Sequence, residues 1–112
     1  MDIFYLVKGD TGSQIKVFLV DEETGDPLDC TDQTVELNFR KKGSSTKLFT
    51  LPNLFVDQDS LLNGIVVFSF EEQLPTLARG YYLGEVQLTD NTSGSIRTVY
   101  ETLPFTVRDE IG

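Results

Sequence analysis

The chain has 112 residues, which is enough for one domain with a single hydrophobic core and too few for two such cores. Its acidic residues outnumber its basic ones by 18 to 9, so the formal net charge is −9 and neither nucleic acid nor an anionic membrane is expected as a partner. One cysteine and no histidine exclude an internal disulfide and a zinc site built from cysteine and histidine.

Residues 3–8 are apolar on both faces and predict a strand that ends at a loop over residues 9–13. The apolar run before Lys8 is too short and wrongly flanked for a signal peptide, and no later segment is long enough to span a membrane. We therefore expect a protein that folds in a cytoplasm and either stays there or is assembled there into a particle released by lysis.

Residues 14–20 alternate with a period of two, which predicts a strand with Ile15, Val17 and Leu19 facing the core. Phe18 and Lys16 then face outward. An outward Phe18 is either an ordinary exposed aromatic or a residue covered by a neighbouring strand or a partner.

Residues 21–27 form an acidic turn, and its carboxylates together with Asp29 admit two interpretations. A calcium site is one, but the alternating ligand pattern of a calcium loop is missing, so a solvated acidic loop is favoured. The pair Asp57 and Asp59 in a later loop is interpreted in the same way.

Residues 34–40 predict a half-buried antiparallel strand with Val35, Leu37 and Phe39 inward. Cys30, shortly before this strand, is predicted to be a buried structural thiol at the rim of the core and not a reactive one, because no histidine is present to activate it.

The tip that follows, residues 41–47, is basic in an otherwise acidic chain, with Lys41, Lys42 and Lys47. These lysines either meet an acidic surface on a partner or serve solubility. Residues 48–51 return as a short strand that Pro52 stops.

A loop is expected over residues 53–63, and the very apolar residues 64–70 predict a central strand. Residues 71–78 predict a crossover with at most one helical turn. The clearest strand follows and ends at a turn over residues 90–94, with Tyr82, Gly84, Val86 and Leu88 on its core face.

The spacing of Leu77, Gly80 and Tyr82 at the start of this strand resembles the tyrosine corner of immunoglobulin-like sandwiches. In such a corner the tyrosine hydroxyl donates a hydrogen bond to the backbone a few residues upstream. The alternative is a tyrosine that is only packed on a half-buried strand.

The last third predicts a strand over residues 95–101, a bulge or edge switch at Pro104, and a closing strand before a polar tail. Short strands, frequent turns and no amphipathic helix indicate an all-β chain. We expect residues 1–112 to form one immunoglobulin-like antiparallel β-sandwich of about seven to eight strands, and parallel α/β architecture is excluded.

An ordered set of motifs along almost the whole chain resembles the N-terminal immunoglobulin-like domain of phage baseplate upper proteins. The motifs are Tyr5-x-x-Lys8-Gly9-Asp10-Thr11, Ile15-x-Val17-x-Leu19-x-Asp21, Pro27-Leu28-Asp29-x-Thr31, Val35-x-Leu37-x-Phe39-Arg40, Asn63-Gly64-x-Val66-x-Phe68, Gly80-x-Tyr82-x-Gly84-Glu85-Val86 and Tyr100-Glu101-x-Leu103-x-Phe105-x-Val107.

The resemblance implies a virion structural role, in which the domain docks onto the tail or baseplate and carries receptor-binding modules. Members of that family usually continue into a helical linker and a second domain, whereas this sequence stops at Gly112. We therefore expect a minimal docking or decoration protein.

Catalysis is not expected from these residues. No histidine, glycine-rich phosphate loop, serine–lysine pair or metal cage is visible in the sequence. The neighbouring Glu71 and Glu72 point apart if they lie in a strand or loop, so they do not make the opposed carboxylate pair of a glycosidase. No cofactor is expected either.

Three binding hypotheses remain. The first is a virion module that assembles as a homo-oligomer with other virion proteins, through sheet edges, the lysine tip and the exposed residues Phe4, Phe18 and Phe49. A capsid decoration protein is its closest rival, separated from it by symmetry and copy number. The third is a carbohydrate-binding sandwich, with Tyr81 as the exposed stacking ring.

Overall fold

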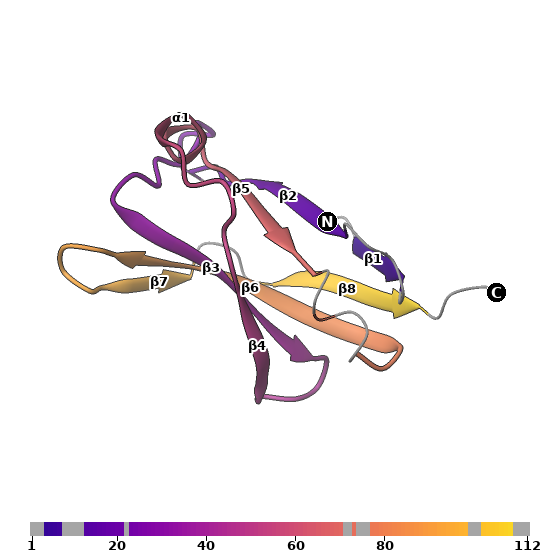
Figure 1. Ribbon diagram of the computed structural model, residues 1–112. Coiled ribbons are helices and arrows are strands. Elements are labelled where there is room, and N and C mark those ends of the chain that lie inside the picture. The colour runs from indigo at the N-terminus through magenta and orange to yellow at the C-terminus, as the bar shows by residue number, and fades with distance from the viewer. Residues whose placement is uncertain are drawn as a thin grey trace.

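The computed structural model describes residues 4–7, 13–21, 23–70, 73, 77–98 and 102–108. For residues 4–7 it describes the backbone alone, and from residue 13 onward it describes side chains as well. This part of the chain contains eight strands and one short helix (Figure 1). In chain order they are β1 (Phe4–Val7), β2 (Gln14–Phe18), β3 (Gln33–Lys41), β4 (Lys47–Pro52), α1 (Gln58–Leu62), β5 (Ile65–Ser69), β6 (Gly80–Asp90), β7 (Ile96–Thr98) and β8 (Leu103–Arg108). The expectation of an all-β sandwich is confirmed.

The strands form two layers. The larger sheet has the order β1-β8-β6-β3-β4, with β7 paired to β6, and the smaller sheet consists of β2 and β5. In Figure 1 the β2–β5 pair lies above the large sheet and runs in much the same direction as β3. All described pairs are antiparallel except β1 with β8, which is parallel, so the expected antiparallel sandwich has one parallel pair.

The core lies between the two sheets, and the period-two pattern of the sequence decides which residues fill it. On β3, Val35, Leu37 and Phe39 are at most 3% exposed, and their neighbours along the strand are more exposed. On β6 the predicted residues of the core face are buried, with Val86 and Leu88 nearly inaccessible. On the opposite layer, β2 and the residue after it bury the three aliphatic side chains predicted to face inward.

Phe39 is the centre of an aromatic cluster. Its ring centroid lies 4.8 Å from that of Phe49, 5.1 Å from those of Tyr82 and Phe105, and 5.3 Å from that of Phe70. Phe49, expected as an exposed residue, is half-buried and stacked on Phe39, because the two residues are direct cross-strand partners on the core face. That expectation of exposure is corrected.

The prediction that residues 64–70 form a central strand is wrong. Among the described residues, β5 pairs with β2 alone. Its other edge is covered by residues 53–54: the Val67 amide donates to Asn53 Oδ1 at 2.9 Å, and the Leu54 amide donates to the Val67 carbonyl at 2.8 Å. Both faces of β5 are buried nonetheless: Val66 belongs to the core between the sheets, and Val67, on the opposite face, is 4% exposed.

The segment expected to be a loop contains the helix α1. Asp57 caps it by accepting a hydrogen bond from the amide of Ser60, and Gly64 follows with a φ of +68°. A Cβ on Gly64 would collide with the carbonyl oxygens of Leu19 and Leu28, so the chain passes here at a distance that glycine alone permits.

The remaining expectations concern the second half of the chain. The crossover over residues 71–78 lies mostly outside the described residues, as does the end of the strand expected at 95–101, of which β7 is the described part. Pro104 lies within β8 opposite Leu83, and the pairing of β8 with β1 begins at the next residue, Phe105. Within the described residues, no helix is long and apolar enough to cross a membrane.

Candidate interaction surfaces

The start of β6 has the geometry of a tyrosine corner. The Tyr82 hydroxyl donates a hydrogen bond to the Ala78 carbonyl at 2.6 Å, four residues upstream. The Tyr82 ring and the Leu77 side chain are both buried, and Gly80 between them has a φ of +151°. Burial raises the pKa of Tyr82, so the hydroxyl remains a donor over the ordinary pH range.

The outer face of the small sheet is apolar at the end where β2 finishes, and polar at Gln14 and Ser69. The register places Phe18 beside Ile65 and Lys16 beside Val67 on this face, since direct antiparallel partners point to the same side. Phe18 is 58% exposed and Phe55 is 37% exposed. The Lys16 ammonium lies 5.6 Å from the ring centroid of Phe18 and 5.8 Å from that of Phe55, so it joins the two rings. We call these five residues the outer β2–β5 face.

Asn53 holds Phe55 on this face. Its Nδ2 donates to the Phe55 carbonyl at 2.8 Å, and its Oδ1 accepts from the Phe55 amide at 3.0 Å as well as from the Val67 amide. Its own amide donates to the Val35 carbonyl at 3.0 Å, so this buried residue connects the two sheets. Sequence reasoning missed both Asn53 and Phe55, although three consecutive apolar residues in a loop, 54–56, are a usable signal.

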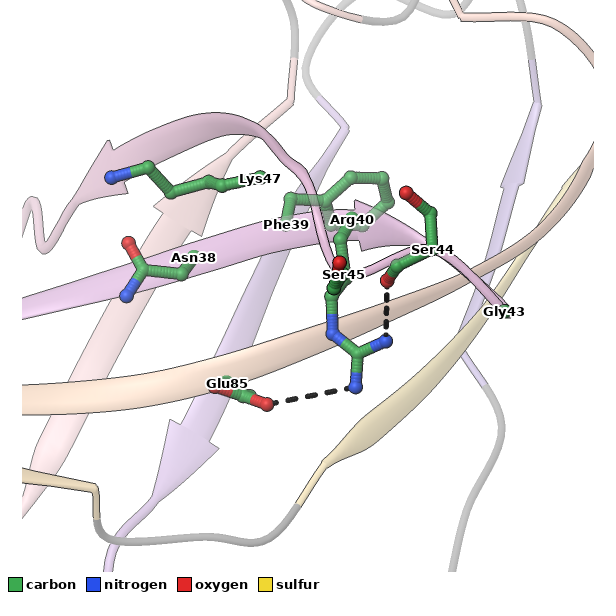
Figure 2. A pocket seen from close by; sticks show the side chains of 8 residues that line it. All are labelled: Asn38, Phe39, Arg40, Gly43, Ser44, Ser45, Lys47 and Glu85. Atoms are coloured by element: carbon green, nitrogen blue, oxygen red, sulfur yellow. Dashed lines mark hydrogen bonds and ion pairs between the residues drawn. The ribbon is translucent and has the colours of Figure 1, made fainter.

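The tip between β3 and β4 carries the predicted lysines, and Lys41, Lys42 and Lys47 are all exposed. Arg40 beside them is held in place: its Nη1 donates to the Ser44 carbonyl at 2.8 Å and its Nη2 lies 3.7 Å from Oε1 of Glu85 (Figure 2). A hollow surrounds this arginine, lined by Asn38, Phe39, Arg40, Gly43, Ser44, Ser45, Lys47 and Glu85.

The lysines of the tip differ from Arg40 in their electrostatic partners. Glu85 is committed to Arg40, and none of the three lysines forms an ion pair within the described part of the chain. Their charges therefore face solvent and are available to an acidic surface.

The predicted aromatic candidates do not form one surface. Phe18 lies on the outer β2–β5 face, whereas Phe49 packs against the core from the large sheet. Phe4 is in β1, and its side chain lies outside the described residues. Tyr81 is 65% exposed beside a second hollow, which is lined partly by Arg79 and Arg108.

The acidic turns bind their own backbone. The carboxylates of Asp29, Asp57 and Asp90 each accept hydrogen bonds from a residue two or three positions later in the chain. These bonds lower the pKa of each carboxyl group. In the described ranges no three cysteine, aspartate or glutamate side chains converge as a metal site would require.

Cys30 is fully buried, and its Sγ lies 3.6 Å from the Leu28 carbonyl oxygen. Burial raises the pKa of the Cys30 thiol to about 11, with a smaller contribution from the negative charge of Asp29. The thiol is thus protonated at neutral pH, as a structural cysteine is.

Comparison with known proteins finds similarity among solved structures. Neither a family model nor a curated protein matches the sequence. Among solved structures the fold is similar to the N-terminal domain of phage TP901-1 ORF48, with a TM-score of 0.66 and 14% sequence identity over 97% of this chain and 85% of that one. At this identity the likeness concerns the fold, so this chain has the sandwich fold of a domain found in a phage protein.

Proposed function

We propose that this domain is a bacteriophage virion structural protein of the tail or baseplate type, which docks onto other virion proteins through protein–protein contacts. The observation that carries the proposal is the similarity over 97% of the chain to the N-terminal domain of a phage protein. The ordered motifs that resemble phage baseplate upper proteins favour the same role.

The outer β2–β5 face is the docking surface in this proposal. It presents Phe18 and Phe55 with a lysine between them, and burying the exposed half of Phe18 contributes about 1 kcal/mol to binding. One such contact is weak. Repetition of the contact by the symmetry of a particle makes the attachment stable, because the sites are then engaged together.

Capsid decoration is the alternative within this class. The two roles differ in stoichiometry: a tail protein is present in proportion to the tail proteins, and a decoration protein in proportion to the major capsid protein. Copy number in purified particles therefore separates them.

The experiment is particle incorporation of surface variants, produced from the genome that encodes the chain. The double variant Phe18→Ser with Phe55→Ser removes both rings of the outer β2–β5 face, and Ile96→Ser is the matched control because Ile96 is 63% exposed on β7 of the other sheet. We expect at least about a tenfold loss of incorporation for the double variant, since tenfold corresponds to about 1.4 kcal/mol, and no loss for the control. Equal incorporation of wild type and double variant would remove the docking role of this face.

A further inference from the structure

The charges of the described residues are separated along β3. Residues 21–32, just before β3, are acidic, whereas residues 41–47, from the last residue of β3 to the first of β4, are basic, with the exposed Lys41, Lys42 and Lys47. We call these three the basic tip. The acidic end consists of the exposed carboxylates Glu23, Asp26, Asp29, Asp32, Asp57 and Asp59.

The backbone brings the carboxylates of the acidic end together from separate segments. The Cys30 amide, next to Asp29, donates to the Leu61 carbonyl of α1 at 2.8 Å, and the Leu28 amide donates to the Leu19 carbonyl at 2.9 Å. The first bond holds Asp29 and Cys30 beside α1, and the second closes the hairpin whose turn contains Glu23 and Asp26. In Figure 1, α1 lies at the top of the molecule and the turn between β3 and β4 at the bottom. The positive charge of Arg97, on β7, also reaches Cys30, whose pKa it lowers, so a cation lies near this end as well.

The two ends are too far apart to neutralise each other within one molecule. The nine residues of β3 span about 27 Å at about 3.4 Å per step, whereas charges in physiological salt are screened over about 8 Å. Each end therefore presents its own charge to solvent, and each matches the opposite end of another copy.

We propose that copies of this chain bind one another head to tail, with the basic tip of one copy on the acidic end of the next. The contact is heterologous, so successive copies close into a ring when the rotation between them permits it and otherwise extend as an open chain. This deepens the proposed function, on which it rests for the high local concentration of copies in a particle.

Charge reversal at each end tests the pairing. A tip variant carries Lys41→Glu, Lys42→Glu and Lys47→Glu, and an end variant carries Glu23→Lys, Asp26→Lys and Asp59→Lys. All six positions are exposed, and Asp57, which caps α1, is left unchanged. From the wild-type charge of −9, three reversals of each kind give −9 − 6 = −15 for the tip variant and −9 + 6 = −3 for the end variant.

The measurement is the weight-average mass of the pure proteins by sedimentation equilibrium at about 1 mM chain, in about 20 mM and about 300 mM sodium chloride. We expect wild type to associate at low salt and to lose at least about tenfold in association constant at high salt. Each variant alone is expected to be monomeric, although the end variant has the smallest net charge. An equimolar mixture of the two variants is expected to associate again, because the reversed tip of one then faces the reversed end of the other.

A wild type that is monomeric at both salt concentrations would overturn the head-to-tail contact. An end variant that associates more strongly than wild type would also overturn it, because general repulsion between like-charged chains would then control association. A mixture no more associated than its components would overturn the specific pairing. These outcomes are independent of whether the chain is found in particles, so failure of this inference and failure of the virion role are distinguishable.

Discussion

Replacing Tyr82 by Phe removes one hydroxyl and leaves the ring in its stack on Phe39. The lost hydrogen bond to the Ala78 carbonyl contributes about 1 kcal/mol, the typical net value, because Ala78 is exposed and its freed carbonyl can bind water. With an entropy of unfolding of about 2.1 cal/mol/K per residue, a domain of 112 residues loses about 4 °C of Tm for each kcal/mol. We expect Tyr82→Phe to lower Tm by about 4 °C.

Thermal unfolding followed by circular dichroism checks this value, and Tyr81→Phe is the matched control. The control makes the same chemical change one residue earlier, at a side chain that is 65% exposed and whose hydroxyl forms no hydrogen bond within the described part of the chain. Its Tm should therefore stay within about 1 °C of wild type. Equal Tm values for the two variants would refute the corner as a stabilising feature and leave Tyr82 as a packed ring.

Three further predictions concern other residues. Gly64→Ala should cost at least about 2 kcal/mol more than Gly43→Ala, measured by urea unfolding, because both residues have positive φ but only the first would place its Cβ against backbone carbonyls. Asn53→Ala should lower the free energy of unfolding by about 3 kcal/mol, since it removes three hydrogen bonds and leaves the buried Val67 amide without a partner; a loss below about 1 kcal/mol would contradict its role between the sheets. Burial raises the pKa of the Cys30 thiol from 9.0 to about 11, so as the pH rises the thiol ionises first in the unfolded chain. The free energy of unfolding of wild type should therefore fall between these pH values, and that of Cys30→Ala should fall less. Parallel plots of unfolding free energy against pH for the two proteins would contradict the raised pKa of Cys30.

The elements that sequence reasoning predicted well are those encoded by local alternation. In β2, β3 and β6 every second residue is apolar, and a strand has one register that buries such a set. The hydrogen bond of the Tyr82 hydroxyl could also be predicted, because its two partners are only four residues apart in the sequence.

What sequence reasoning missed depends on contacts between distant segments. β5 is apolar on both faces, which fits a central strand and also an edge strand covered by a loop, and only the position of Asn53 beside Val67 distinguishes the two. The five residues of α1 are too few to show a helical period, and its signal is confined to the cap at Asp57. Phe49 lies in a strand with apolar residues on both faces, so the sequence pattern does not show which face is buried. The pairing of Phe49 with Phe39 places it on the core face.

The most direct test of the virion role is quantitative mass spectrometry of particles purified from the lysate that encodes this chain. We predict that the chain is present at a fixed copy number in proportion to the tail proteins and remains after high-salt washing and a density gradient. A copy number in proportion to the major capsid protein would replace tail docking by shell decoration. Absence of the chain from purified particles, with the free protein left in the lysate, would contradict the virion role.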